Sequence, residues 1–131
     1  MPAGSGLAAD FVFLRSAKNA TAQVSRAEVK AFYTAKAKTW KSGLDVTILL
    51  NAPGSPEFKW LAEVIGAPEE VVLAKIKQEV FRGEMRKPET VATPAECVEA
   101  LKRIDGGICL VDAASAKSLP AGVAVLGYSG G

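Results

Sequence analysis

The sequence predicts a single three-layer α/β domain in which a mixed β-sheet carries helices on both faces. Short continuous apolar runs alternate along the chain with amphipathic helical segments, and about half of its 131 residues are hydrophobic. This length suffices for one domain with a substantial core, and no internal repeat or linker divides it. The predicted order is strand, helix, strand, three helices, strand and strand, which is typical of helices packed against a mixed sheet.

The first half begins with a predicted strand at residues 10–15, a run of aromatic and branched side chains. Ser25 and Glu28 have the spacing of a capping box, so a helix is expected to start there. Its apolar residues recur at spacings of three and four, and we expect it to extend to a turn near Gly43. Residues 46–50 are apolar apart from Thr47, which predicts a strand covered on both faces.

The middle of the chain contains two further predicted helices. Ser55 is placed to cap the first of them, with Pro56 at the first helical position, where a missing amide costs nothing. That helix is expected to end at Gly66, and a longer one to stop near Gly83. Residues 84–91 are polar and predict a loop.

The last part of the chain repeats the pattern of capped helix and strand. Thr93 and Glu96 predict a second capping box, and the helix that follows should end before Gly106. The apolar runs at 108–111 and 123–126 predict the last two strands.

The composition excludes several classes of function. The formal net charge is only +2 and the basic residues are spread along the chain, which argues against a nucleic-acid partner. No apolar run approaches the roughly 20 residues of a membrane span, so no membrane insertion is expected. The chain has no histidine, which removes Ser-His and Cys-His centres and most zinc sites. We therefore expect no catalytic residue, metal or cofactor, and a protein that is not an enzyme.

The two cysteines are predicted to lie in the core. Cys97 falls on the apolar face of a helix and Cys109 within a buried strand, so we expect two small apolar side chains. A disulfide is the alternative if the two elements pack together in an oxidising compartment.

The ends of the chain are expected to lie outside the domain, which we place at residues 10–128. Residues 1–9 are rich in Gly, Ala and Ser and should be flexible, and residues 129–131 should fray. The first segment lacks the basic start and apolar centre of a signal peptide. This leaves open either a cytoplasmic protein or one whose signal has been replaced.

Seven short patterns occur in order between about residues 10 and 127. They are Ser25-x-x-Glu28-Val29-x-x-Phe32-Tyr33, Lys36-x-x-x-Trp40-x-x-Gly43, an apolar strand, Gly54-Ser55-Pro56-x-Phe58, Val64-Ile65-Gly66, Phe81-x-Gly83 and Gly106-Gly107-Ile108-Cys109-Leu110-Val111. Together they resemble the second lobe of the substrate-binding proteins of phosphate ABC transporters. The resemblance implies one lobe of a type II periplasmic binding protein, non-enzymatic and periplasmic or secreted, that binds phosphate or another small anion in transport or sensing.

The resemblance also implies what such a lobe needs from elsewhere. Complete members of the family close two lobes on the anion, whereas this chain is long enough for one. A second wall for the cleft would then come from another protein or from a second copy of the chain.

The resemblance further implies a ligand site at the start of one helix. In the family an Arg and an Asp precede a Ser-Gly-Thr whose hydroxyls and free amides hold phosphate. Here Asn51 and Pro53 occupy about the positions of that Arg and Asp, Pro56 lacks an amide, and Glu57 adds a negative charge. The expected ligand-binding residues are Asn51, Gly54, Ser55 and Glu57.

Each of these features also has an interpretation without a ligand. Ser55 can act as a helix N-cap alone. Lys36, Lys38 and Lys41 beside Trp40 can solvate a helix end or grip an acidic partner. The alternative function is accordingly an interaction or scaffold module that kept the fold and lost the anion site, which exposed apolar surface at Trp40 or Phe81 would favour.

Overall fold

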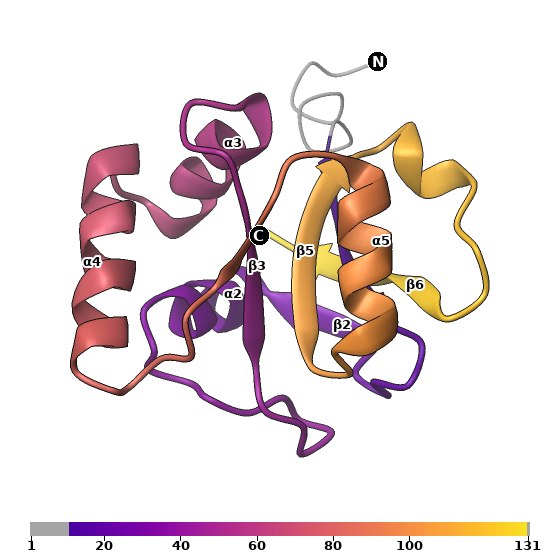
Figure 1. The fold of residues 1–131 in the computed structure, drawn as a ribbon, viewed down its shortest axis with the longest axis horizontal. Coiled ribbons are helices and arrows are strands. Elements are labelled where there is room, and N and C mark those ends of the chain that lie inside the picture. Colours follow the sequence, from indigo (N-terminus) through magenta and orange to yellow (C-terminus); the bar gives the residue numbers. More distant parts are fainter. Residues whose placement is uncertain (1–10, 131) are drawn as a thin grey trace.

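A computed structural model describes residues 11–130 as one six-stranded sheet covered by helices (Figure 1). The strands lie in the order β2-β6-β1-β5-β3-β4. β1 runs antiparallel to both of its neighbours, and the other pairs are parallel. The elements are β1 (Phe11–Ser16), β2 (Gln23–Ser25), α2 (Arg26–Tyr33), β3 (Thr47–Asn51), α3 (Pro56–Ile65), α4 (Glu69–Phe81), β4 (Glu89–Val91), α5 (Pro94–Arg103), β5 (Gly107–Asp112), the short 3-10 helix η1 (Ser115–Lys117) and β6 (Val123–Ser129). The predicted mixed α/β fold is confirmed.

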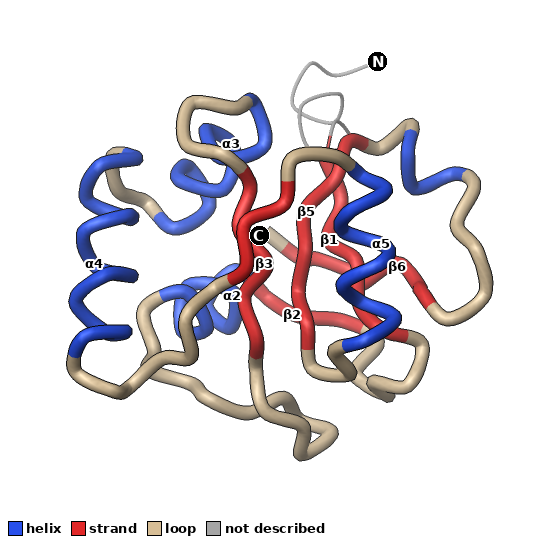
Figure 2. Tube along the Cα trace, viewed as in Figure 1, coloured by secondary structure: helices blue, strands red, loops and turns tan. Residues whose placement is uncertain are grey.

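The central strands separate two apolar cores, because successive side chains of a strand point to opposite faces. In β1, Phe13 belongs to the core formed with α2, α3 and α4, whereas Leu14 belongs to the core under α5. In β5 the side chains alternate between the two cores in the same way. Figure 2 shows α5 crossing in front of the strands, with α4 at the far edge of the molecule. These two cores create the three layers that the sequence predicted.

A disulfide joins the α5 side of the sheet to its central strand. Cys97 of α5 and Cys109 of β5 are bonded, with their Cα atoms 6.1 Å apart and both side chains fully buried. Our expectation of two reduced core cysteines was wrong. The two elements pack directly on each other, which is the structural condition for the alternative.

The predicted helix starts are confirmed, and one of the two predicted capping boxes is complete. Ser25 and Glu28 make both bonds of a capping box. The Glu28 amide donates to Ser25 Oγ at 3.2 Å, and the Ser25 amide donates to Glu28 Oε1 at 2.9 Å. At α5 the Glu96 amide donates to Thr93 Oγ1, but the Glu96 carboxylate accepts from the Ala92 amide instead of the Thr93 amide. The second capping box is therefore only half formed.

The first predicted helix is shorter than we expected. α2 ends at Tyr33, and Ala35 adopts a left-handed conformation with φ of 62°. The amide of Lys36 then bonds back to the carbonyl of Ala31 at 2.9 Å, which closes the helix end. The chain runs on as a loop to Trp40, which we had placed near the end of the helix. The indole of Trp40 is buried there and donates to the carbonyl of Gly106 at 2.8 Å.

Two short edge strands were not predicted. β2 pairs with β6, and β4 pairs with β3 inside the segment 84–91 that we expected to be a loop. Each has three residues, of which one is buried, so neither shows an apolar run. β6 continues through Ser129, the first residue of the expected frayed tail. The expected flexible segment 1–9 lies outside the described residues.

Within residues 11–130, no helix is both long enough and apolar enough to cross a membrane.

Replacing both Cys97 and Cys109 by alanine should lower the free energy of unfolding by about 3 kcal/mol, because the bond restricts a loop of twelve residues in the unfolded chain. Urea unfolding of the two proteins followed by circular dichroism measures the difference. A reductant should shift the midpoint of the wild-type protein and leave that of the double variant unchanged. Equal midpoints for both proteins without reductant would contradict the prediction.

Replacing Gly106 by alanine should destabilise the fold by about 1–3 kcal/mol or more. A Cβ at this position would lie 1.8 Å from the carbonyl oxygen of Asp45, so the backbone of the 40–47 loop would have to move. Thermal unfolding measures the effect. Gly43→Ala is the control in the same loop, since nothing lies within 4 Å of its added Cβ and only the positive φ resists it. A smaller loss for Gly106→Ala than for Gly43→Ala would contradict the assignment.

Candidate functional site

The carboxyl ends of the parallel strands β3, β4 and β5 lie at one edge of the sheet, at the top of Figure 1. In open α/β sheets, ligand-binding crevices form outside the carboxyl ends of the strands. α3 and α5 begin from the connections at this edge, so their amino-terminal ends lie beside it. The four residues predicted to bind a ligand all lie at this edge: Asn51, Gly54, Ser55 and Glu57.

The turn between β3 and α3 is shaped by its glycine and serine. Gly54 has φ of 85°, a left-handed conformation that glycine adopts readily. The amide of Ser55 bonds to the carbonyl of Ala52 at 3.1 Å, and Ser55 Oγ accepts from the amide of Phe58 at 3.2 Å. The predicted N-cap role of Ser55 is confirmed.

The Gly54 amide already contacts an anionic group of the protein itself. It donates to Glu69 Oε1 at 3.0 Å, so a carboxylate from the first turn of α4 sits on the β3–α3 turn. Sequence analysis did not place Glu69 at this site. A glutamate in the first turn of a helix is favourable there without any further role, and no local spacing connects Glu69 with Gly54.

Asn51 and Glu57 are the other two residues predicted to bind a ligand. The Asn51 side-chain amide donates to the carbonyl of Leu110 at 3.1 Å and so ties β3 to β5. Glu57 is partly buried in the first turn of α3. The structure therefore brings Gly54, Ser55 and Glu57 together at one turn, while the Asn51 amide is used within the sheet.

Asp112 at the end of β5 is a further polar residue of this edge that the sequence analysis missed. Its carboxylate accepts from Ser115 Oγ at 2.6 Å and from the Ser115 amide at 3.1 Å. The hydrogen bond from the Ser115 hydroxyl is the main cause that lowers the pKa of Asp112, and the backbone bonds lower it further. Asp112 thus stays ionised and adds negative charge.

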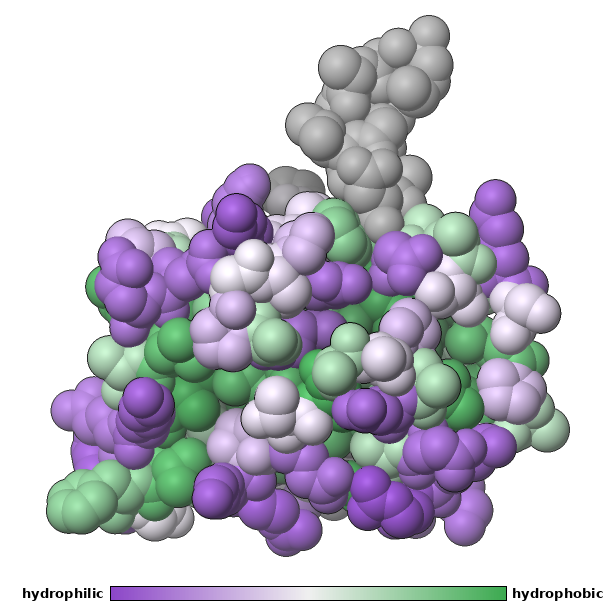
Figure 3. All heavy atoms as spheres, turned by 45° about the horizontal axis from the view of Figure 1, so that its top comes forward, coloured by the Kyte–Doolittle hydropathy of each residue, from purple (hydrophilic) through white to green (hydrophobic). Residues whose placement is uncertain are grey.

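The groups described at this edge disfavour tight binding of an anion. Its carboxylates include those of Glu57, Glu69 and Asp112, and the hydroxyls of Ser55 and Ser115 already serve internal bonds. Figure 3 looks toward this edge and shows hydrophilic residues interspersed with smaller apolar areas. The arrangement offers a turn with amide donors but little positive charge.

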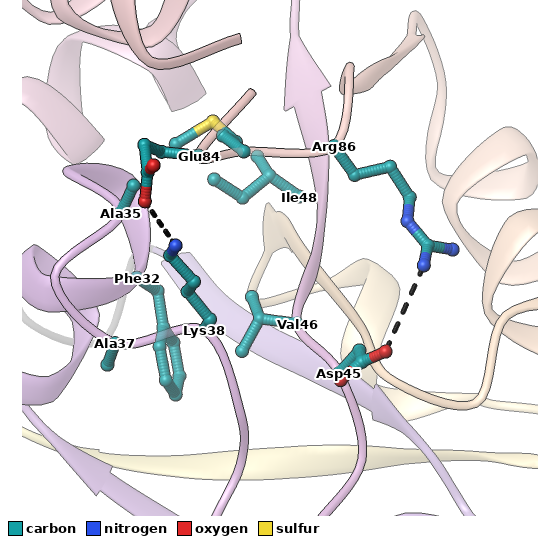
Figure 4. A pocket seen from close by; sticks show the side chains of 10 residues that line it. Phe32, Ala35, Ala37, Lys38, Asp45, Val46, Ile48, Glu84 and Arg86 are labelled. Carbon is teal, nitrogen blue, oxygen red and sulfur yellow. Dashed lines mark hydrogen bonds and ion pairs between the residues drawn. The ribbon is translucent and has the colours of Figure 1, made fainter. Parts of the chain in front are cut away.

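A separate hollow of about 230 Å³ lies at the opposite end of the sheet (Figure 4). An ion pair between Lys38 and Glu84 lies at one side, and Arg86 and Asp45 pair at 4.0 Å on the other. The lining between them is largely apolar: Phe32, Ala35, Ala37, Val46, Ile48 and Met85. All four charged side chains are substantially exposed, so these pairs contribute little to stability.

The predicted group of lysines beside Trp40 does not form a single basic patch. Lys38 pairs with Glu84, and Lys41 Nζ lies 3.2 Å from Glu28 Oε2. Lys36 lies instead at a groove beside α2.

Among residues 11–130, no group of three or more Asp, Glu, Cys or His side chains is arranged to hold a metal ion.

The sequence matches no family model and no curated protein. The fold, in contrast, is similar to solved phosphate-binding proteins. These include PstS from Borrelia burgdorferi, with a TM-score of 0.68 at 14% identity over 91% of this chain and 47% of that one. A putative phosphate ABC transporter substrate-binding protein with bound phosphate from Clostridium perfringens gives 0.67 at 14% identity, covering 91% and 44%. An ABC-type phosphate transport receptor from Vibrio cholerae gives 0.58 at 8% identity, covering 91% and 46%.

The chain therefore has the fold of one part of these proteins and spans less than half of the length of each. This likeness confirms the fold that the seven sequence patterns implied.

Ser115→Ala should raise the pKa of Asp112 toward its ordinary value of 3.8, because it removes the strongest bond to the carboxylate. An NMR titration of the carboxyl carbons measures the shift. A lowered pKa in the folded state contributes stability above the pKa of the unfolded chain, and this stability is lost as the pH falls through the folded value. The variant should therefore be less stable than the wild type at neutral pH, with the difference shrinking in acid. An unchanged titration of Asp112 would contradict this account.

Proposed function

We propose that this chain is a non-enzymatic binding lobe that takes phosphate or a similar small oxyanion at the β3–α3 turn. The second wall of its cleft would come from another lobe or from a second copy of the chain. The fold shared with phosphate-binding proteins and the position of the turn at the carboxyl ends of the strands support the proposal.

The observation that carries the proposal is the bond from the Gly54 amide to the Glu69 carboxylate. It shows that the turn presents a backbone donor to an anionic oxygen, which is what an oxyanion requires of a helix start. Ser55 adds a hydroxyl next to this donor, and the dipole of α3 favours negative charge at the same point. A bound oxyanion would take the place of the Glu69 carboxylate.

The same contacts predict that a single lobe binds weakly. The anion must displace Glu69, and Pro56 offers no amide at the first helical position. Glu57 repels a negative charge in the first turn of α3. Tight binding would therefore need basic groups from the second wall. Each charge-assisted hydrogen bond from such a group would contribute about 1.5–3 kcal/mol.

The disulfide supports a location outside the cytoplasm. Bonds such as Cys97–Cys109 form and persist in oxidising compartments and are rare where thiols are kept reduced. We propose that the protein acts in the periplasm or is secreted.

The alternative function, an interaction module without an anion site, is favoured by one observation. Phe81 at the end of α4 is 93% exposed, as a protein contact would require. Trp40, the other residue named for this alternative, is buried in the core at 2% exposure.

Glu69→Gln should tighten phosphate binding by about tenfold or more, because it removes the competing negative charge from the Gly54 amide. Isothermal titration calorimetry at low salt, with sulfate as the comparison, measures the change. Glu70→Gln is the matched control: it removes the same charge from the first turn of α4 at a residue without this bond. A dissociation constant above about 1 mM for phosphate in both the wild type and Glu69→Gln would rule out the anion site and leave the interaction module.

Ser55→Ala should lower the free energy of unfolding by about 1 kcal/mol through the lost cap. In the Glu69→Gln background it should also weaken phosphate binding, if Ser55 Oγ contacts the anion. Urea unfolding and the same titration separate the two effects. A change in stability without a change in affinity would leave Ser55 with the role of a cap only.

A further inference from the structure

A groove runs along α2, away from the β3–α3 turn, on the side of the helix that faces the α3–α4 connection. It consists of two adjoining hollows of about 560 and 260 Å³ that share Lys30, Ile65 and Gly66. Gly66 ends α3 with φ of 87° and has no side chain to fill the space.

The floor of this groove is apolar. Ile65 and Val72 are buried core residues that reach it from α3 and α4. Val71 lies beside them on the first turn of α4 and is 51% exposed, so it adds apolar surface to the groove. The groove therefore offers apolar contact area that α2, α3 and α4 do not cover.

The charged side chains of the groove are all basic. The whole chain has 16 basic and 14 acidic residues, yet four basic and no acidic residues line the two hollows. Arg26 is held by the carbonyls of Val64 and Glu63, and Lys75 Nζ lies 3.0 Å from the Glu79 carboxylate. The remaining two, Lys30 and Lys36, are more available to an occupant of the groove.

Lys30 and Lys36 are exposed, and neither makes an ion pair within the described part of the chain. They lie at the rim of the groove above its apolar floor. An occupant with negative charge beside apolar groups would complement both.

Tyr33 provides a hydrogen-bond donor at the groove. It lines the groove, and its hydroxyl is not among the polar side-chain atoms of the described range that are buried without a partner. A phenol hydroxyl at this position can donate to a bound carboxylate. Burial also raises the pKa of Tyr33, which keeps the hydroxyl protonated and able to donate. A carboxylate oxygen is a suitable acceptor.

We infer that this groove is the docking site for an acidic segment of a partner protein, in which carboxylates alternate with apolar side chains. The basic groups are distributed along the groove, with Arg26 in one hollow and Lys36 and Lys75 in the other, and do not converge on one point. This distribution suits an extended chain with several carboxylates better than a single small anion. The apolar floor suits the side chains between them.

The test uses the full chain and a six-residue peptide of alternating Leu and Glu, followed by two-dimensional NMR at low salt. A peptide of alternating Ser and Glu tests the apolar floor, and one of alternating Leu and Lys tests the charge. We expect saturable shifts of the amides of residues 26–36 and 65–75 with the Leu-Glu peptide, and much weaker effects with the other two.

The double variant Lys30→Gln, Lys36→Gln should weaken binding of the Leu-Glu peptide by about tenfold. Lys59→Gln with Lys117→Gln is the matched control, since it removes the same charge from exposed lysines outside both hollows and should change the affinity little. Tyr33→Phe should weaken binding while leaving the helix and its packing in place.

Three results would overturn the inference. They are no saturable binding of the Leu-Glu peptide below about 1 mM, equal loss of affinity in the two double variants, and phosphate alone producing the same shifts at residues 26–36. The last result would assign the groove to a small ion. The proposed oxyanion site is tested separately, because its shifts belong to residues 51–58 and respond to Glu69→Gln.

Discussion

β5 lies between β1 and β3, and both of its faces are buried by different helices. Its residues alternate between the core with α2, α3 and α4 and the core with α5, so every side chain from Ile108 to Val111 must be apolar. This constraint fixes the rest of the architecture. α5 is bonded covalently to one face through Cys97, while the Trp40 loop is held at the start of the strand through Gly106. The edge carrying Asp112 is consequently a rigid end of the most buried strand.

The polar groups at that edge are largely used by the protein itself. Ser55 caps α3, Asn51 ties two strands together, and Glu69 occupies the Gly54 amide. A surface of this kind is stable without a ligand, because each of these three groups makes a hydrogen bond within the protein. An incoming anion must then exchange bonds one for one, and the net gain per bond is small. The groove along α2 differs, since Lys30 and Lys36 make no ion pair within residues 11–130.

Most of the fold could be predicted from the sequence because its signals are local. Continuous apolar runs, capping residues and terminal glycines indicated the four long helices and the long strands. The end of α2 could not be predicted, because it depends on Ala35 taking a left-handed conformation that glycine usually provides. Contacts between distant residues were equally inaccessible. The bond of Glu69 to Gly54 spans fifteen residues, and the disulfide required knowing that α5 packs on β5. The candidate site was thus located by the resemblance, but its internal carboxylate was not foreseen.

The antiparallel pairing of β1 with β6 has a mechanical consequence. Phe13 lies opposite Leu126 at one end of this pairing, and from that end β1 continues beside β5 while β6 continues beside β2. A pulling force applied at Phe11 and Ser129 would load the hydrogen bonds between the two strands one at a time, from the open end inward, instead of shearing them together. The domain should therefore yield to tension at low force, even though its two cores resist thermal unfolding. The disulfide would keep α5 joined to the centre of β5 after the sheet had opened.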